Sequence, residues 1–328
     1  MISRRAFVGG SAALTVGAAA SASNAQPPPK AYRLGILSPG PAAGTTFAEL
    51  LKQHLRDLGY TEGRNLIVEW RDADGKPDRF DTLAADLVRL NVDAILASVP
   101  GATFAAKRAT VSIPIVMMNT PDPVHLRLVA SLSRPGGNIT GTTTLSADLC
   151  VKQLELLKTA VPSAQRIAVL WNPTNPWHPI AVKGIEQGAP SLSVRLDLLQ
   201  VAGPGDFDGA FGRIAAQQDH ALLVLADPMT FFHRVRLAEL SSNRRIPSMF
   251  GLREHVQVGG LMSYWAHGPE LYRRVATYLD RIFKGAKPGD LPIEQASRFD
   301  LVINLRTARL LNVRIPESLL LRADEVIR

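Results

Sequence analysis

The chain has 328 residues, with 37 lysines and arginines against 29 acidic residues and a single cysteine. This basic surplus is spread over the chain without a basic run or an arginine-rich helix, which argues against a nucleic-acid-binding protein. One cysteine excludes an intramolecular disulfide framework and any multi-cysteine metal site. The length is sufficient for two domains of ordinary size.

Residues 1–25 have the features of an export signal peptide. The Ser-Arg-Arg-x-Phe pattern of residues 3–7 precedes an apolar run of small residues, and no acidic residue occurs before Glu49. The pattern indicates twin-arginine export, with Sec export as the alternative. Cleavage after Ala25 or after Ala22 fits equally well. No cysteine stands at either point, so we expect a soluble periplasmic product that is not embedded in the membrane.

Beyond the leader, short apolar runs alternate with amphipathic helical patterns. We expect strands at residues 34–37, 66–70, 94–97, 113–117 and 139–143, and helices at 47–58, 80–90 and 102–109. Strands separated by helices predict an α/β, doubly wound parallel sheet covered on both faces.

The second half of the chain repeats the order of the first half. RLGIL at 33–37 is echoed by RIAVL at 166–170, DAIL at 93–96 by HALL at 220–223, Ile-Pro at 113–114 by Ile-Pro at 246–247, and Gly-Gly at 136–137 by Gly-Gly at 259–260. Ordered echoes predict two lobes of like topology.

We place the N-terminal lobe at 32–145, completed by about 266–290, and the C-terminal lobe at 146–265, completed by about 291–328. The helical pattern at 269–284 should pack back on the first lobe. A chain that crosses between lobes more than once restricts their motion to a hinge bend, which suits closure on a ligand.

Ligands of open parallel sheets bind outside the carboxyl ends of the strands. The residues expected there are Ser38, Ser98, Thr103, Asn119 and Asp122 from the first lobe, and Asn172, Asp227, Phe250 and Tyr264 from the second. The carboxylates suit an ammonium group, and the two aromatic rings suit an apolar or aromatic moiety. Turn formation or helix capping is the alternative for the polar residues, and core packing is the alternative for Phe250.

Catalytic and metal-binding motifs are missing from the sequence. It contains no Gly-x-Ser-x-Gly, His-Glu-x-x-His or Gly-x-x-x-x-Gly-Lys pattern. The aspartates at 72–78 differ from a calcium loop because Pro77 stands where the loop needs glycine. We therefore expect no catalysis, no cofactor and no metal.

Several longer motifs together resemble a known family. They are LGYTEGRNL at 58–66, RPGGNITG at 134–141, WNP at 171–173, GGLMSY at 259–264 and RADEVI at 322–327. The chain resembles the periplasmic substrate-binding components of ABC transporters of the tryptophan/tyrosine type. The resemblance implies a type I periplasmic-binding-protein fold, no catalysis, and a solute of amino-acid or organic-acid size captured between the lobes by hinge closure.

The same resemblance implies delivery to an ABC transporter permease, and we expect a monomer. The loops at 99–102 (VPGA) and 119–121 (NTP) depart from the family pattern, which leaves the solute open. A ligand-presenting sensor subunit and a secreted α/β enzyme are the alternative functions.

Overall fold

The structure, a computed structural model, describes residues 30–41, 45–118, 120–144 and 147–328. The predicted export signal at 1–25 and the predicted site residue Asn119 lie outside these residues. Residues 31–328 cluster as one unit. Within the described ranges, no helix has the length and apolar character needed to cross a bilayer.

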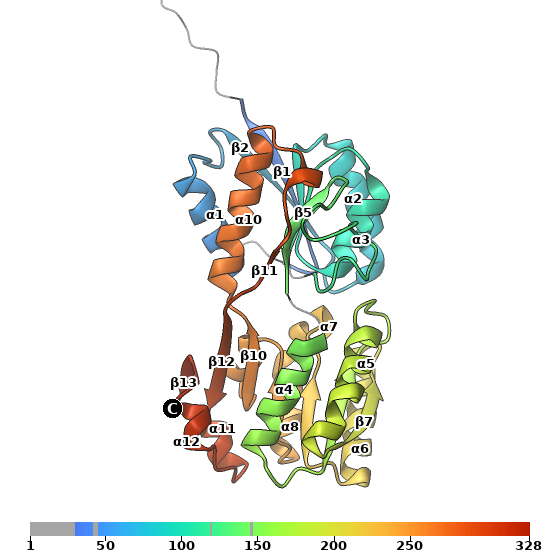
Figure 1. Cartoon of the computed structure of the whole chain (residues 1–328), viewed down its shortest axis with the longest axis vertical. Helices are drawn as coiled ribbons and strands as arrows, with labels where there is room; N and C mark the ends of the chain where they lie inside the picture. Colours follow the sequence, from blue (N-terminus) through green and yellow to red (C-terminus); the bar gives the residue numbers. More distant parts are fainter. Residues whose placement is uncertain (1–29, 42–44, 119, 145–146) are drawn as a thin grey trace, which may run out of the picture. The chain divides into compact units, whose positions relative to one another are not determined.

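The apolar runs of the first half form a parallel sheet (Figure 1). The strands at 94–97 and 139–143 are covered on both faces, and every one of their residues is buried. In spatial order, the strands are β11 (Glu294–Gln295), β5 (Ile139–Thr143), β4 (Ile115–Met117), β3 (Ala94–Ala97), β1 (Tyr32–Ser38) and β2 (Leu66–Asp72).

Helices cover both faces of this sheet. The four helices that pack on it are α1 (Thr46–Asp57), α2 (Phe80–Arg89), α3 (Pro100–Ala109) and α10 (Gly268–Phe283). Leu37 and Ile95 face the core beneath α2 and α3, whereas Ile36 and Leu96 face the core beneath α1 and α10. The helix α3 begins two residues earlier than the sequence pattern predicts, because a proline is well suited to the first helical position.

The second half forms a mixed sheet. In spatial order, its strands are β13 (Glu325–Ile327), β12 (Phe299–Asn304), β10 (Met262–Ala266), β9 (Ser248–Phe250), β8 (Ala221–Val224), β6 (Arg166–Trp171) and β7 (Arg195–Gln200). The β10–β12 pair is antiparallel and the other pairs are parallel.

The helices of the second half are α4 (Ala147–Ala160), α5 (His178–Gly188), α6 (Phe207–Gln217), α7 (Pro228–Phe232), α8 (Arg234–Asn243), α9 (Arg253–Gln257), α11 (Leu305–Leu310) and α12 (Glu317–Leu320). Helices α4 and α5 contribute to one core of the sheet, and α6 and α8 contribute to the core on its other face. The free cysteine, Cys150, is a buried residue of α4.

The duplication predicted from the echoes is confirmed by the strand order. The order β5-β4-β3-β1-β2 in one sheet matches β10-β9-β8-β6-β7 in the other. Equivalent backbone hydrogen bonds occur in both: Ile95 N donates to the Pro114 carbonyl at 2.8 Å, and Leu222 N donates to the Pro247 carbonyl at 2.9 Å. Two lobes of like, doubly wound topology are therefore present.

The segment after α10 returns along the first sheet before it reaches the second. Leu291 and Ile293 are buried in the cores of the first sheet, and β11 pairs with β5. The sequence-based boundary at 290/291 assigns this segment to the second lobe, whereas in the structure the second sheet resumes only at β12. A strand of two residues has too little pattern to be predicted.

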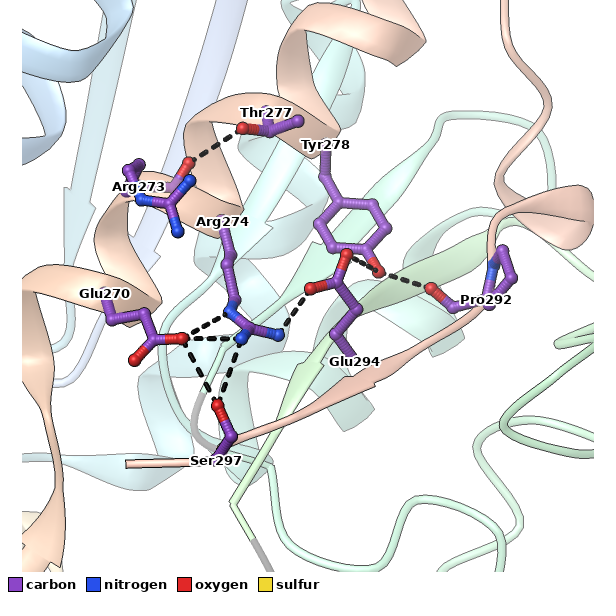
Figure 2. Close-up of polar contacts among 8 residues, drawn as sticks. All are labelled: Glu270, Arg273, Arg274, Thr277, Tyr278, Pro292, Glu294 and Ser297. Atoms are coloured by element: carbon purple, nitrogen blue, oxygen red, sulfur yellow. Dashed lines mark hydrogen bonds and ion pairs between the residues drawn. The ribbon is translucent and has the colours of Figure 1, made fainter. Parts of the chain in front are cut away.

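An ionic network fastens α10 to this return segment (Figure 2). The Arg274 guanidinium pairs with Glu270 one turn earlier, with an Nε to Oε1 distance of 3.1 Å, and also pairs with Glu294 of β11. The hydrogen bond from Arg274 lowers the pKa of the Glu270 carboxyl. The Tyr278 hydroxyl donates to the Pro292 carbonyl and lies 3.3 Å from Glu294. Helix α10 and the return segment therefore form one connected piece at the crossing between lobes.

Candidate ligand-binding site

The two predicted serines lie together at the carboxyl ends of the first sheet. Ser38 ends β1 and Ser98 follows β3, and both are buried. The Ser98 hydroxyl donates to the Leu37 carbonyl at 3.2 Å. The Ser38 hydroxyl lies 3.0 Å from the Gly40 carbonyl and also contacts the carboxylate of Asp72 at the end of β2. The contact of Ser38 with Gly40 is the local turn that the sequence offers as the alternative, whereas the bond from Ser98 to Leu37 joins two neighbouring strands.

A chain of threonine hydroxyls links the next strand ends. Thr103 is fully buried in α3, and its hydroxyl lies 3.1 Å from both the Val99 carbonyl and the Thr120 hydroxyl. The Thr120 carbonyl accepts a hydrogen bond from Thr143 at 2.6 Å. Next to it, the buried Thr144 hydroxyl has no hydrogen-bond partner among the described residues. An acceptor or donor supplied from outside the chain would satisfy that group.

Asp122 forms a local turn at the same edge. Its φ of 38° places it in the left-handed region, and its Oδ1 accepts from the His125 backbone N–H at 3.1 Å. This is the behaviour of a turn-forming aspartate. The second carboxylate oxygen of Asp122 has no such backbone bond in the described part of the chain.

In the second lobe, Asp227 is the centre of a buried polar cluster. It follows β8, it is 5% exposed, and its Oδ1 caps α7 by accepting from Met229 N at 2.8 Å. Its Oδ2 accepts from Asn175 Nδ2 at 2.9 Å, and Asn172 Nδ2 lies 3.3 Å from both oxygens. Across the residues that the structure describes, no lysine or arginine forms an ion pair with Asp227. Neutral donors thus hold a buried negative charge that no protein cation balances.

The neighbouring histidine does not supply that cation. The backbone N–H of Asn172 donates to His178 Nδ1 at 2.8 Å, so the ring proton must be on Nε2, which lies 3.1 Å from the Ala226 carbonyl. Burial lowers the pKa of His178 despite the nearby Asp227 carboxylate. His178 is therefore neutral at pH 7, and the charge of Asp227 remains unbalanced.

The two predicted aromatic residues are not brought together. Phe250 is fully buried in the core that α6 and α8 cover, where it stacks on His255 at a centroid distance of 4.6 Å. Tyr264 is half-buried, packs on the core of the opposite sheet face and stacks on Phe299 at 5.7 Å. Because strand side chains alternate between faces, these rings cannot enclose one ligand group, and core packing describes Phe250. Burial raises the pKa of the Tyr264 hydroxyl.

The His255 ring under Phe250 should make the protein acid-sensitive. Burial lowers the pKa of His255 to about 4, although its Nε2 lies 3.1 Å from the Thr230 carbonyl. Because the folded-state pKa lies below the unfolded value of about 6.5, stability is retained above pH 6.5 and lost as the pH falls towards 4. We expect wild type to lose about 3 kcal/mol more unfolding free energy than His255→Gln between pH 7 and pH 4. Urea titrations at each pH measure the difference, and parallel profiles would rule out this role.

Sequence reasoning missed several polar members of the strand-end clusters, among them Asp72, Asn175 and His178. A signal for Asn175 was present, because Asn-Pro occurs at both 172–173 and 175–176. Repeated Asn-Pro steps mark turns in which the asparagine side chains bond locally. The partners of Asp72 and His178 are set by tertiary packing and have no such local signal.

The comparisons with known proteins decide the family. The family described as ABC transporter substrate binding protein matches residues 42–327. The chain belongs to this family. The match confirms the resemblance that the sequence motifs indicated. Members of this family bind substrates, so the chain is a binding protein and not an enzyme.

Similar proteins and structures agree with this assignment. A tyrosine-binding protein of Clostridioides difficile (strain R20291) is 26% identical over 261 residues, covering 79% of this chain and 74% of the relative. The crystal structure of a conserved domain protein from Vibrio cholerae is 26% identical, with a TM-score of 0.84 over 90% of this chain and 100% of that one. An ABC domain of Streptococcus pneumonia in complex with L-Trp is 23% identical, with a TM-score of 0.82 over 91% and 100% of the two chains. The predicted type I periplasmic-binding-protein fold is confirmed.

Proposed function

We propose that this substrate-binding protein captures an amino acid in the periplasm and delivers it to the permease of an ABC importer. The observation that carries the proposal is the buried Asp227 carboxylate, which Asn172, Asn175 and a helix-capping N–H hold without a lysine or arginine counter-ion among the described residues. A ligand ammonium group would supply the missing positive charge and add charge-assisted hydrogen bonds. The ligand's ammonium end binds to this cluster.

Relatives and the leader support the rest of the proposal. One relative is named for tyrosine and one similar structure holds L-Trp, so an aromatic amino acid is the first ligand class to test. The serine hydroxyls of Ser38 and Ser98, Thr103 with its neighbours, and Asp122 line the first lobe's share of the site, with Tyr264 at the second lobe's edge. Asn119, outside the described residues, belongs to the same predicted edge. The signal-like segment at 1–25 directs the chain to the periplasm, and hinge closure between the lobes encloses the solute.

Thermal unfolding in the presence of single solutes tests this function. L-Tryptophan, L-tyrosine and L-phenylalanine are compared with their desamino acids, such as indole-3-propionate. Saturation at a hundredfold over Kd should stabilise the protein by about 2.7 kcal/mol and raise Tm by several degrees. The desamino acids should give no shift, because they cannot neutralise Asp227. Equal shifts from both sets would contradict the ammonium assignment, and no shift from any amino acid would contradict the ligand class.

A further inference from the structure

The aromatic ring of Phe232, the last residue of α7, packs on two glycines of the first lobe. A Cβ built on Gly40 would lie 2.1 Å from Phe232 Cζ and 2.5 Å from its Cε1. A Cβ built on Gly75 would lie 3.6 Å from Phe232 Cδ2. The ring therefore occupies the space that a side chain at residue 40 would fill.

Gly40 and Gly75 lie on two neighbouring loops that together contact this ring. Gly40 follows β1 and Gly75 follows β2, and the two loops are joined by a hydrogen bond from Gly75 N to the Pro39 carbonyl at 2.7 Å. Gly75 needs to be glycine for its backbone, since its φ is 73°. Gly40 is not among the residues with positive φ. A side chain at position 40 would meet the far edge of the Phe232 ring, so the ring would have to leave its place.

This contact joins the two halves of the proposed site. Helix α7 starts from Asp227, its capping residue, and ends at Phe232. On the other side, the carbonyl of Gly40 accepts from Ser38, the predicted site residue at the end of β1. The ring thus connects the Asp227 end of the second lobe to the Ser38 end of the first.

We propose that Phe232 is an affinity-determining residue, whose ring seats on Gly40 and Gly75 and holds the lobes closed over the solute. The proposal rests on the proposed function. An apolar ring that leaves water only when the lobes approach stabilises the closed state over the open one. Since the closed state retains ligand, loss of the ring should act mainly on the dissociation rate.

Phe232→Ala tests the proposal against Phe231→Ala as a matched control. Phe231 is on the same helix and half-buried, but its ring contacts Phe232 and the Arg234 guanidinium rather than either glycine. Using L-tryptophan as the probe, we expect Phe232→Ala to raise Kd about ten- to thirtyfold, mainly through a faster dissociation rate. Phe231→Ala should stay within about threefold of wild type. Equal effects from the two variants would overturn the assignment.

Gly40→Ala provides a second, independent test. The added methyl group collides with the ring only when Phe232 is seated, so Gly40→Ala should raise Kd about tenfold or more in wild type and have little further effect in Phe232→Ala. Strict additivity of the two substitutions would show that the residues do not meet in the bound state and would overturn the proposal.

A failure of the Phe232 proposal can be distinguished from a failure of the proposed amino-acid function. If no amino acid shifts the Tm of wild type, the proposed function fails. The contact of the Phe232 ring with Gly40 and Gly75 is then tested by small-angle X-ray scattering of the ligand-free protein. Phe232→Ala should then show a larger radius of gyration than Phe231→Ala, because the lobes lose a contact. Equal radii would overturn the seating itself.

Discussion

Asp227→Asn should weaken the binding of L-tryptophan by at least about thirtyfold at pH 7 while the protein remains folded. Removing one partner of a buried, hydrogen-bonded charge pair costs about 2 to 5 kcal/mol, which corresponds to factors of about thirty to several thousand. Asparagine keeps the size of the side chain and an oxygen for Met229 N, and it is as good a helix cap as aspartate. The change removes the charge and also replaces the oxygen that accepts from Asn175 Nδ2 with an amide nitrogen, which can only donate. Isothermal titration calorimetry measures the combined loss.

Two controls make this result specific. Asp219→Asn neutralises another buried carboxylate of the second lobe, one that pairs with Arg166 and lies before β8 rather than after it. It should bind L-tryptophan as wild type does. Indole-3-propionate should bind Asp227→Asn at least as well as wild type, because the unbalanced charge that repels a carboxylate ligand has gone. Wild-type affinity of Asp227→Asn for L-tryptophan would remove Asp227 from the site.

The sequence was sufficient to predict the central parallel strands and the like topology of the two lobes. Runs such as 94–97 and 221–224 are continuously apolar because helices cover both faces of their sheets, so each run marks a central parallel strand. The echo of Ile-Pro at 113–114 and 246–247 marks β4 and β9, whose preceding carbonyls accept equivalent hydrogen bonds. An apolar run or an Ile-Pro step involves only residues that are adjacent in the chain, so it can be recognised in a single sequence.

The orientation of the site residues could not be predicted in the same way. In a strand buried on both faces, the alternation of side chains leaves no polar face to show which way Phe250 or Tyr264 points. The hydroxyl of Ser38 and the carboxylate of Asp227 find partners that depend on loop geometry. The contact between Phe232 and Gly40 joins residues almost two hundred positions apart, and neither residue type signals the other.

Gly141→Ala should destabilise the first lobe by about 3 to 5 kcal/mol, the largest stability effect we expect from a single methyl group in this protein. Gly141 lies in β5 opposite Met117 of β4, and its φ of 130° is one that other residues rarely adopt. A Cβ there would lie 2.2 Å from the Met117 carbonyl oxygen and 2.7 Å from its nitrogen, so strand backbone rather than a flexible side chain would have to move.

Gly137→Ala, in the same RPGGNITG segment, is the matched control, because a Cβ at residue 137 meets no atom within 4 Å and its φ is not positive. Urea unfolding followed by circular dichroism should show an early transition for Gly141→Ala and a change within about 0.5 kcal/mol for Gly137→Ala. Similar midpoints for the two variants would show that β4 and β5 are not packed as closely as the structure indicates.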